Sequence, residues 1–486
     1  MHAVVFWGTL VCLGYMLAVF GSSALVLIVS SLDNAIRSRE TLAENFDVLV
    51  SSRFTPPVSV IIPAYNEEGM VMLTIRSVLA FDYAEFEVIV VDDGSTDGTF
   101  EVLQRELDLE PFGYYERRIV ECAPVVGVYR SRRYEHVKVI QKQNGGTKAD
   151  ASNCGLNYAR FRYVLLLDGD TLYEPDALLN SMRLAASDPQ RVIGLTGHIS
   201  VASHPETTIG ARAQDREAID ATLLSNFQHL EYLRSFLNTR LGWSRLGFMM
   251  CVSGAFSLWR RDVVEEVGGW STEFSCEDIE LTFRVHEYMR RNGRPYRILS
   301  IPEMVARTEA PGRIRALVSQ RARWQRVTLE TLWSYRRMIG NPRYGFAGLV
   351  AIPLMVLSEG LGLVFELLGL GTLALGIALG VFSWQTYVVF LVSMAFGLAV
   401  LTSAAVLMED ISTRAYRLRH IARLIALGPL ELVAYRPILM WARFRGTVAF
   451  LRSEKGWDKF DRNERSLPFQ PDVAGLSSAG DASRAA

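Results

Sequence analysis

The stretch LLLDGDTLY, residues 165–173, joins an apolar run to two acidic residues. The run predicts a buried strand, and Asp168 and Asp170 follow it with one glycine between them. Carboxylates this close repel each other, so a cation or hydrogen-bond donors must compensate their charge. A Mg²⁺ or Mn²⁺ ion takes oxygen ligands and keeps coordination sites for phosphate oxygens. The stretch therefore predicts a strand end that holds a metal and a diphosphate, although Asp-Gly-Asp alone also fits a solvated turn.

Four short runs rich in β-branched residues predict the strands of one sheet. Segments of helical periodicity separate them, which indicates parallel βαβ units and an α/β fold. Ligands of such sheets bind beyond the carboxyl ends of the strands. The runs are VSVII (58–62), EVIVV (87–91), VKVIQ (137–141) and YVLLLD (163–168). The acidic segments at three of these ends are PAYNEE (63–68), DDGSTDGT (92–99) and DGD (168–170). Residues 109–136 break the pattern, and we interpret them as an irregular insertion over the sheet.

The composition indicates a membrane protein with a globular domain. The 486 residues are 50% hydrophobic and 21% charged, and the mean hydropathy is +0.16. The formal net charge is -1, so no basic field predicts a nucleic-acid partner. Five scattered cysteines form neither a disulfide framework nor a zinc pattern, which favours a reducing compartment.

Apolar segments flank the predicted α/β region. Residues 3–32 carry no charge and exceed the roughly 20 residues of one membrane span, so we expect a retained anchor over residues 1–33. Arg37 and Arg39 follow, and the positive-inside rule then places the globular domain, residues 54–335, in the cytoplasm. The expected location is the inner (cytoplasmic) membrane, with membrane lipids as partners.

A second apolar region spans residues 346–441. Residues 386–408 predict one span, and residues 347–382 predict another together with an interfacial helix. The charges of residues 421–441 favour an interfacial amphipathic helix over a span. The protein would therefore be multi-pass, and residues 465–486 have the composition of a disordered tail.

Seven motifs in order carry a resemblance to a known family. They are VSVIIPAYNEE, VVDDGSTDGT, NGGTKADASNCGL, LLLDGD, SGAFSLWRRDVV, GGWSTEFSCEDIELTFRV and QRARW. The set resembles the membrane-embedded family 2 glycosyltransferases, which include cellulose, chitin, hyaluronan and poly-N-acetylglucosamine synthases. The resemblance implies a GT-A-type nucleotide-sugar-binding domain inserted between transmembrane helices. QRARW, residues 320–324, is similar to the Q-x-x-R-W signature of processive synthases.

The resemblance also implies a donor site. Asp170, with Asp168, would hold Mg²⁺ or Mn²⁺, which stabilises the departing diphosphate as a Lewis acid. Asp92 is a weaker candidate than its neighbour Asp93. The implied nucleotide-binding residues are Pro63, Tyr65, Glu67, Asp93, Lys148 and Asp168.

The acceptor side is implied by the later motifs. Asp278 would be the general base for the attacking hydroxyl, with Glu277 beside it, although EDIELTFRV is also typical of an acidic first helical turn. Trp324 would stack on the acceptor sugar, although an interfacial anchor is the alternative. The implied acceptor and diphosphate residues are Gln320, Arg321, Arg323, Trp324, Ser253 and Gly254.

The implied function is inverting, processive transfer from a UDP-sugar to a growing polysaccharide, coupled to export. The SGAF segment departs from cellulose synthases, so N-acetylglucosamine is the favoured sugar. The alternatives are transfer of one sugar to a lipid or lipid-linked acceptor, and an inactive docking or receptor protein. A dinucleotide-binding oxidoreductase is disfavoured because no G-x-G-x-x-G follows the first strand. With so few expected spans, either interfacial helices or a second copy or small membrane partner would complete the export path.

Overall fold

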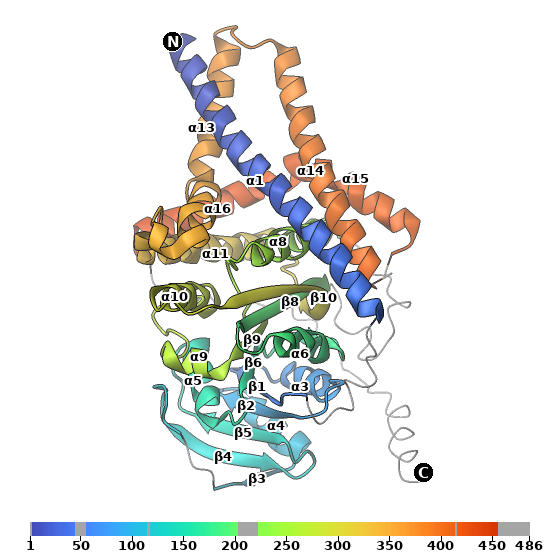
Figure 1. Cartoon of the computed structure of the whole chain (residues 1–486), viewed down its shortest axis with the longest axis vertical. Helices are drawn as coiled ribbons and strands as arrows, with labels where there is room; N and C mark the ends of the chain where they lie inside the picture. Colours follow the sequence, from blue (N-terminus) through green and yellow to red (C-terminus); the bar gives the residue numbers. More distant parts are fainter. Residues whose placement is uncertain (1, 44–54, 114–116, 203–221, 414–415, 455–486) are drawn as a thin grey trace.

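The computed structural model describes residues 2–43, 55–113, 117–202, 222–413 and 416–454, and the predicted tail at 465–486 lies outside these ranges. Figure 1 shows three tiers along the long axis of the molecule. An α/β domain occupies one end, a layer of helices lies across it, and upright helices form the other end.

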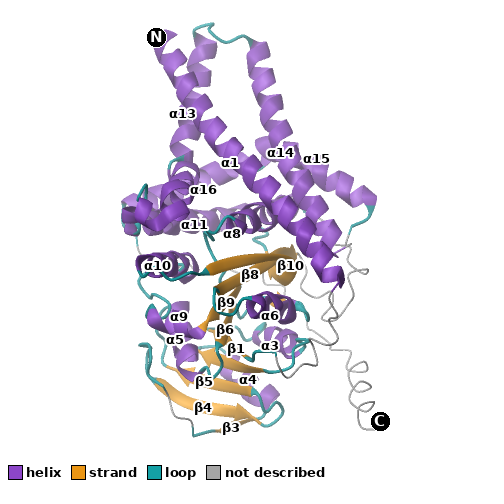
Figure 2. Ribbon diagram, viewed as in Figure 1, coloured by secondary structure: helices purple, strands orange, loops and turns teal. Residues whose placement is uncertain are grey.

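One sheet runs through the α/β domain as a continuous stack of strands (Figure 2). Within the described residues its order is β3-β4-β5-β2-β1-β6-β9-β8-β10-β7. The strands are β1 (Val58–Ala64), β2 (Phe86–Asp92), β3 (Leu109–Pro111), β4 (Val125–Ser131), β5 (Val137–Lys142), β6 (Tyr163–Leu167), β7 (Leu172–Tyr173), β8 (Val192–Ala202), β9 (Phe256–Arg260) and β10 (Arg297–Glu309).

The four predicted strands form the parallel centre of this sheet. Val58 of β1 is level with Phe86 of β2 on one side and with Tyr163 of β6 on the other. β5 extends the parallel set beside β2. The α/β prediction is therefore confirmed, and the sheet is mixed because β9 pairs antiparallel with both β6 and β8.

The interpretation of residues 109–136 as an insertion over the sheet was wrong for residues 109–111 and 125–131. These residues form β3 and β4, which continue the sheet past β5 in antiparallel pairs. Val128 lies opposite Ile140, and Tyr129 lies opposite Val139. The segment VVGVYRS of β4 is stabilised by pairing with β3 and β5, and its own pattern was too weak to predict a strand.

Helices cover both faces of the sheet, because alternate residues along each central strand place apolar side chains on opposite faces. Val60 and Ile62 belong to the apolar core on one face, while Ile61 belongs to the core on the other. The first core packs beneath α3 (Val71–Leu79), α4 (Thr99–Leu107) and α6 (Ala177–Ser187). The second packs beneath α5 (Lys148–Tyr158), α9 (Arg261–Glu266) and α10 (Glu277–Arg291).

The upright helices of Figure 1 are α1 (His2–Ala43), α13 (Gly362–Ala378) and α14 (Trp384–Thr413). Among the described residues, His2–Arg37 and Trp384–Ile411 are long and apolar enough to cross a membrane. Two bent helix pairs would raise the number of candidate spans to four, namely Ala347–Gly360 with Gly362–Ala378 and Leu418–Ala434 with Arg436–Leu451. The number of membrane crossings, and the side of the membrane on which the α/β domain lies, stay predictions.

The middle layer joins the upright helices to the sheet. Asp33 of α1 forms ion pairs with Arg37, at 2.7 Å, and with Arg245, at 3.2 Å. The segment expected as one interfacial helix over 421–441 consists of two, because the chain bends by 52° where Pro437 opens the second. The layer contains α7 (Leu223–Leu233), η2 (Arg234–Arg240), α8 (Leu241–Arg245), α11 (Ile314–Ser334), α15 (Leu418–Ala434) and α16 (Arg436–Leu451), and short helical turns η3 (Arg336–Met338), η4 (Pro342–Tyr344), η5 (Ala347–Ala351), α12 (Ile352–Met355) and η6 (Val356–Gly360) lead into α13.

A buried histidine on β8 makes the stability of this fold sensitive to acid. Burial lowers the pKa of His198 to about 4, and neither ring nitrogen has a hydrogen-bond partner among the described residues. Because the folded-state pKa is depressed, its contribution to stability is present above about pH 6.5 and is lost as the pH falls toward 4. We expect the thermal midpoint to fall over this range, and less so in His198→Leu. The exposed His2→Leu is the control, and equal acid sensitivity in all three proteins would contradict the prediction.

Candidate active site

The loop after β6 is held in place by side chains beneath it. The amide of Asp168 donates to the Tyr173 hydroxyl at 2.9 Å, and this hydroxyl lies 2.9 Å from the Ala255 carbonyl oxygen. Thr74 donates to the Gly169 carbonyl oxygen at 2.9 Å. Burial raises the pKa of Tyr173, so its hydroxyl remains protonated and able to donate. Our sequence reasoning missed Tyr173, although it is the last residue of the LLLDGDTLY stretch.

Lys148 connects the separate parts of the site. Its Nζ forms an ion pair with Asp168, donates to the Gly254 carbonyl oxygen at 3.1 Å and lies 3.4 Å from Glu277 Oε1. Burial opposes the charge of this ammonium, but Asp168 and Glu277 outweigh burial and raise the pKa of Lys148. One cation therefore compensates carboxylates from two distant parts of the sequence.

The acidic pair at the start of α10 lies on the other side of Lys148. Asp278 Oδ2 accepts from the Gly254 amide at 3.0 Å, and Oδ1 accepts from the Ile279 amide at 2.7 Å. Glu277 is buried, and burial raises its pKa although Lys148 opposes this shift. The structure thus brings Asp168, Gly254, Glu277 and Asp278 together around one ammonium.

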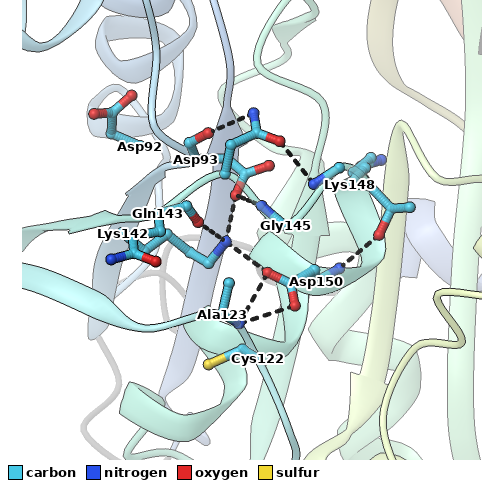
Figure 3. A network of polar contacts seen from close by, with 12 residues as sticks. Asp92, Asp93, Cys122, Ala123, Lys142, Gln143, Gly145, Lys148 and Asp150 are labelled. Carbon is cyan, nitrogen blue, oxygen red and sulfur yellow. Dashed lines mark hydrogen bonds and ion pairs between the residues drawn. The ribbon is translucent and has the colours of Figure 1, made fainter.

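A second buried lysine orients Asp93 (Figure 3). Lys142 forms ion pairs with Asp93 and, at 2.5 Å, with Asp150. The Gly145 amide also donates to Asp93, at 3.1 Å, and the Ala123 amide donates to Asp150, at 3.0 Å. The carboxylate of Asp93 is therefore fixed, and burial raises its pKa.

Sequence reasoning missed Lys142 and Asp150, although both lie in or beside quoted motifs. Lys142 ends the VKVIQK strand, and Asp150 lies in NGGTKADA. A Cβ atom at Gly145 would fall on the Asp150 carboxylate, so the glycine is required for this close approach. Asp92, the weaker candidate, accepts from the Ser95 amide at 3.2 Å within its own loop.

The loop after β1 packs against the loop after β2. Asn66 adopts a φ of 55°, and its amide donates to Ser95 Oγ at 3.0 Å. The Glu67 amide donates to Thr99 Oγ1 at 2.8 Å. Tyr65 and Glu67 are half-buried on this loop, whereas Pro63 is buried within β1 beside Val91. The acidic loops therefore meet at one edge of the sheet, as expected.

A divalent metal fits this edge only with help from its substrate. Among the described residues, no three side chains of Asp, Glu, His or Cys are arranged to hold a metal ion. Mg²⁺ and similar ions are often bound by one or two carboxylates plus substrate phosphates. Asp168 and Asp170, both half-buried after β6, match that incomplete donor set.

The QRARW segment lies on α11, where a buried ion pair supports its tryptophan. Arg321 Nε and Nη2 contact the Glu231 carboxylate at 3.1 and 2.9 Å, and its guanidinium lies 4.1 Å from the centre of the Trp324 ring. Tyr435 also donates to Glu231, at 2.6 Å. This pairing explains Arg321 as a support for Trp324, and its expected contact with a diphosphate stays a prediction. Glu231, on α7, gave no sequence signal.

The remaining predicted acceptor and diphosphate residues lie in three different surroundings. Gln320 accepts from Arg321 at 2.5 Å, and Trp324 remains 37% exposed, as an acceptor platform requires. Arg323 lines a cavity between α11 and α16. Ser253 directly precedes Gly254, the residue whose carbonyl oxygen accepts from Lys148. The Ser253 carbonyl oxygen accepts from the Phe256 amide at 3.0 Å.

Comparison with known proteins assigns the domain. Residues 59–268 match the family described as glycosyl transferase family 2. Poly-beta-1,6-N-acetyl-D-glucosamine synthase of Staphylococcus epidermidis is 26% identical over 57% of this chain and 57% of its own length. The synthase of the same name from Staphylococcus aureus strain MSSA476 is 25% identical over 55% of this chain and 53% of its own length. The chain thus spans little more than half the length of these relatives.

Two solved structures are similar over a large part of the chain. The mannosyltransferase PcManGT from Pyrobaculum calidifontis, in complex with GDP-Man and Mn²⁺, is 18% identical, with a TM-score of 0.49 over 90% of this chain and 99% of its own. Staphylococcus aureus TarS 1–349 with UDP-GlcNAc is 16% identical, with a TM-score of 0.35 over 82% and 92%. At TM-scores this low, nothing about the chemistry of this chain follows from them. The family match and the sheet together show that this chain carries a glycosyl transferase family 2 domain with a GT-A-like fold, flanked by two candidate membrane-spanning helices.

Proposed function

We propose that this protein is an inverting, processive glycosyltransferase that extends a polysaccharide from a UDP-sugar. The relatives are named poly-beta-1,6-N-acetyl-D-glucosamine synthases, which favours N-acetylglucosamine as the transferred sugar. The Q-x-x-R-W resemblance of residues 320–324 favours many transfers over one. The candidate membrane-spanning helices of the same chain support export of the product.

One observation carries the proposal, namely the contacts of Lys148. Its Nζ is paired with Asp168, from the loop assigned to the donor, and lies 3.4 Å from Glu277, beside the proposed base. The same atom donates to Gly254, whose amide donates to Asp278. The side chains assigned to the sugar donor and those assigned to the acceptor thus lie close together. A direct displacement needs this, because the acceptor hydroxyl must be held next to the sugar carbon that it attacks.

Asp278 is the proposed base for this displacement. Transfer with inversion requires a group that accepts the proton of the acceptor hydroxyl as it attacks C1. The Gly254 and Ile279 amides hold the Asp278 carboxylate in one orientation. Glu277 lies beside Asp278 and 3.4 Å from the Lys148 ammonium, and burial raises its pKa. Asp278 is also half-buried rather than sealed, so an acceptor can reach it.

The donor is proposed to bind along the carboxyl ends of β1, β2 and β6. Asp93, fixed by Lys142, would accept from the nucleobase, with Tyr65 and Glu67 around the ribose. A Mg²⁺ or Mn²⁺ ion at Asp168 and Asp170 would supply Lewis-acid stabilisation of the departing diphosphate. Lys148 neutralises Asp168 and thereby lowers the negative charge that a diphosphate meets.

The acceptor is proposed to stack on Trp324, which the Arg321–Glu231 pair holds in place. Arg323 is the proposed diphosphate contact from this segment. Residues 1–33 and 346–441 would anchor the protein in the inner membrane, with residues 54–335 on the cytoplasmic side. With at most four candidate spans among the described residues, a second copy or a small membrane partner would complete the export path.

Asp278→Asn is expected to lower sugar incorporation at least a hundredfold, because the amide cannot accept the proton. UDP affinity should stay near the wild-type value, since Asp278 contacts the acceptor side. Membranes would be supplied with each radiolabelled UDP-sugar and either Mg²⁺ or Mn²⁺, and the product would be sized. Asp82→Asn, at an exposed position after α3, is the matched control. Full turnover in Asp278→Asn would refute the base assignment, and addition of a single sugar would refute processivity.

Glu231→Gln is expected to weaken the hold on Arg321 and so disorder Trp324. The KM for the acceptor should rise about tenfold, while the KM for the UDP-sugar should stay unchanged. Breaking a buried ion pair also costs about 3–5 kcal/mol of stability, so the thermal midpoint is measured in parallel. Glu106→Gln breaks a partly exposed pair with Arg76 and serves as control. An equal rise in both KM values would contradict a role confined to the acceptor site.

A further inference from the structure

A cavity of about 340 Å³ lies between α11 and the end of α16. Its wall carries four arginines, of which Arg323 and Arg326 come from α11 and Arg445 and Arg452 from α16 and its C-terminal end. The only acidic side chain among the residues that line it is Glu454. The lining thus holds four guanidinium groups and one carboxylate, although Arg326 also pairs with Glu330, at 3.5 Å, outside the lining.

Part of this positive charge is uncompensated. Arg445 is exposed and makes no hydrogen bond or ion pair with any residue that the structure describes. Arg452 lies 3.8 Å from Glu454, and both are more than half exposed, so this contact is weak. Gathering like charges in one concavity raises the free energy of the folded state unless an anion binds there. The cavity is therefore suited to an anionic group.

The same cavity has an apolar side. Phe444, Val448 and Ala449 line it beside the arginines. Trp441 stacks on Phe444, with ring centres 5.6 Å apart, and the two side chains are 56% and 43% exposed. A free inorganic anion would gain nothing from exposed aromatic rings, whereas the boundary between headgroups and acyl chains favours both rings and arginines.

The position of the cavity in the fold also favours a membrane lipid as its ligand. α11 and α16 belong to the layer that lies across the feet of the upright apolar helices (Figure 1). Basic pockets beside membrane helices recognise phospholipid headgroups through their phosphates. A guanidinium suits this role because its planar fork meets phosphate oxygens in pairs.

We propose that this cavity binds the phosphate of an anionic phospholipid headgroup, with the acyl chains lying along Phe444 and Trp441. Arg445 supplies charge that no carboxylate among the described residues balances, and Arg452 is only weakly paired with Glu454. Arg326 connects the site to the catalytic loop, because its Nη2 donates to Ser275 Oγ at 2.8 Å and Ser275 precedes Glu277 by two residues. The proposal concerns lipid binding and does not depend on which sugar the enzyme transfers.

The test is direct lipid binding to the full-length protein. Protein purified in a neutral detergent is titrated with phosphatidylglycerol, with phosphatidylcholine and inorganic phosphate as separate arms, and bound ligand is counted by native mass spectrometry. Phosphatidylglycerol should bind, and neither other ligand should displace it. Arg445→Gln with Arg452→Gln should weaken its binding about thirtyfold, because each basic residue near an anionic headgroup contributes about fivefold.

Arg436→Gln is the matched control, since Arg436 is an exposed arginine of the same helix that does not line the cavity. Its affinity for phosphatidylglycerol should equal that of the wild type. If the double variant fails to fold, Arg452→Gln alone, at a side chain 71% exposed, should still show about a fivefold loss. Unchanged affinity in these variants would overturn the site, and displacement of the lipid by equimolar inorganic phosphate would assign the cavity to a soluble anion.

Discussion

The arrangement of this active site depends on one half-buried ammonium, that of Lys148. Asp168, after β6, lies close to Glu277 and Asp278 at the start of α10, and carboxylates brought together in this way repel each other. Lys148 makes this approach possible because its Nζ pairs with Asp168, stays within 3.4 Å of Glu277 and bonds to the Gly254 carbonyl oxygen. The loop that precedes β9 and the start of α10 are thereby tied to the end of β6. The geometry proposed for transfer follows from that single compensating charge.

The same principle recurs where other distant segments meet. Lys142 stands between Asp93 and Asp150, and Arg321 joins α11 to Glu231 on α7. Arg234 pairs with Glu431 at 2.6 Å and thus joins η2 to α15 within the middle layer. A buried ion pair adds little net stability, but removing one partner leaves a charge without compensation. These pairs therefore act chiefly to specify which segments lie together, and the cavity between α11 and α16 stands out because its arginines outnumber its carboxylates.

The tiers of the molecule bring these features into one chemical path. The sheet presents its acidic loops at one edge, and Trp324 on α11 lies in the layer between that edge and the upright helices. A sugar polymer made at such a place would begin next to the apolar helices it has to pass. A phospholipid bound beside α16 would lie in the same layer, one hydrogen bond from the loop that leads into α10.

The sequence by itself determined the parallel centre of the sheet, the order of its acidic loops and the two long apolar helices, because these features depend on local period and composition. It did not predict β3 and β4, whose pairing depends on β5, or the break between α15 and α16. Only the tertiary structure decided that Lys142, Asp150, Tyr173 and Glu231 support the site and that four arginines surround one cavity. Such contacts join residues far apart in the chain, and their distances are set by how helices and strands pack, which no local pattern records.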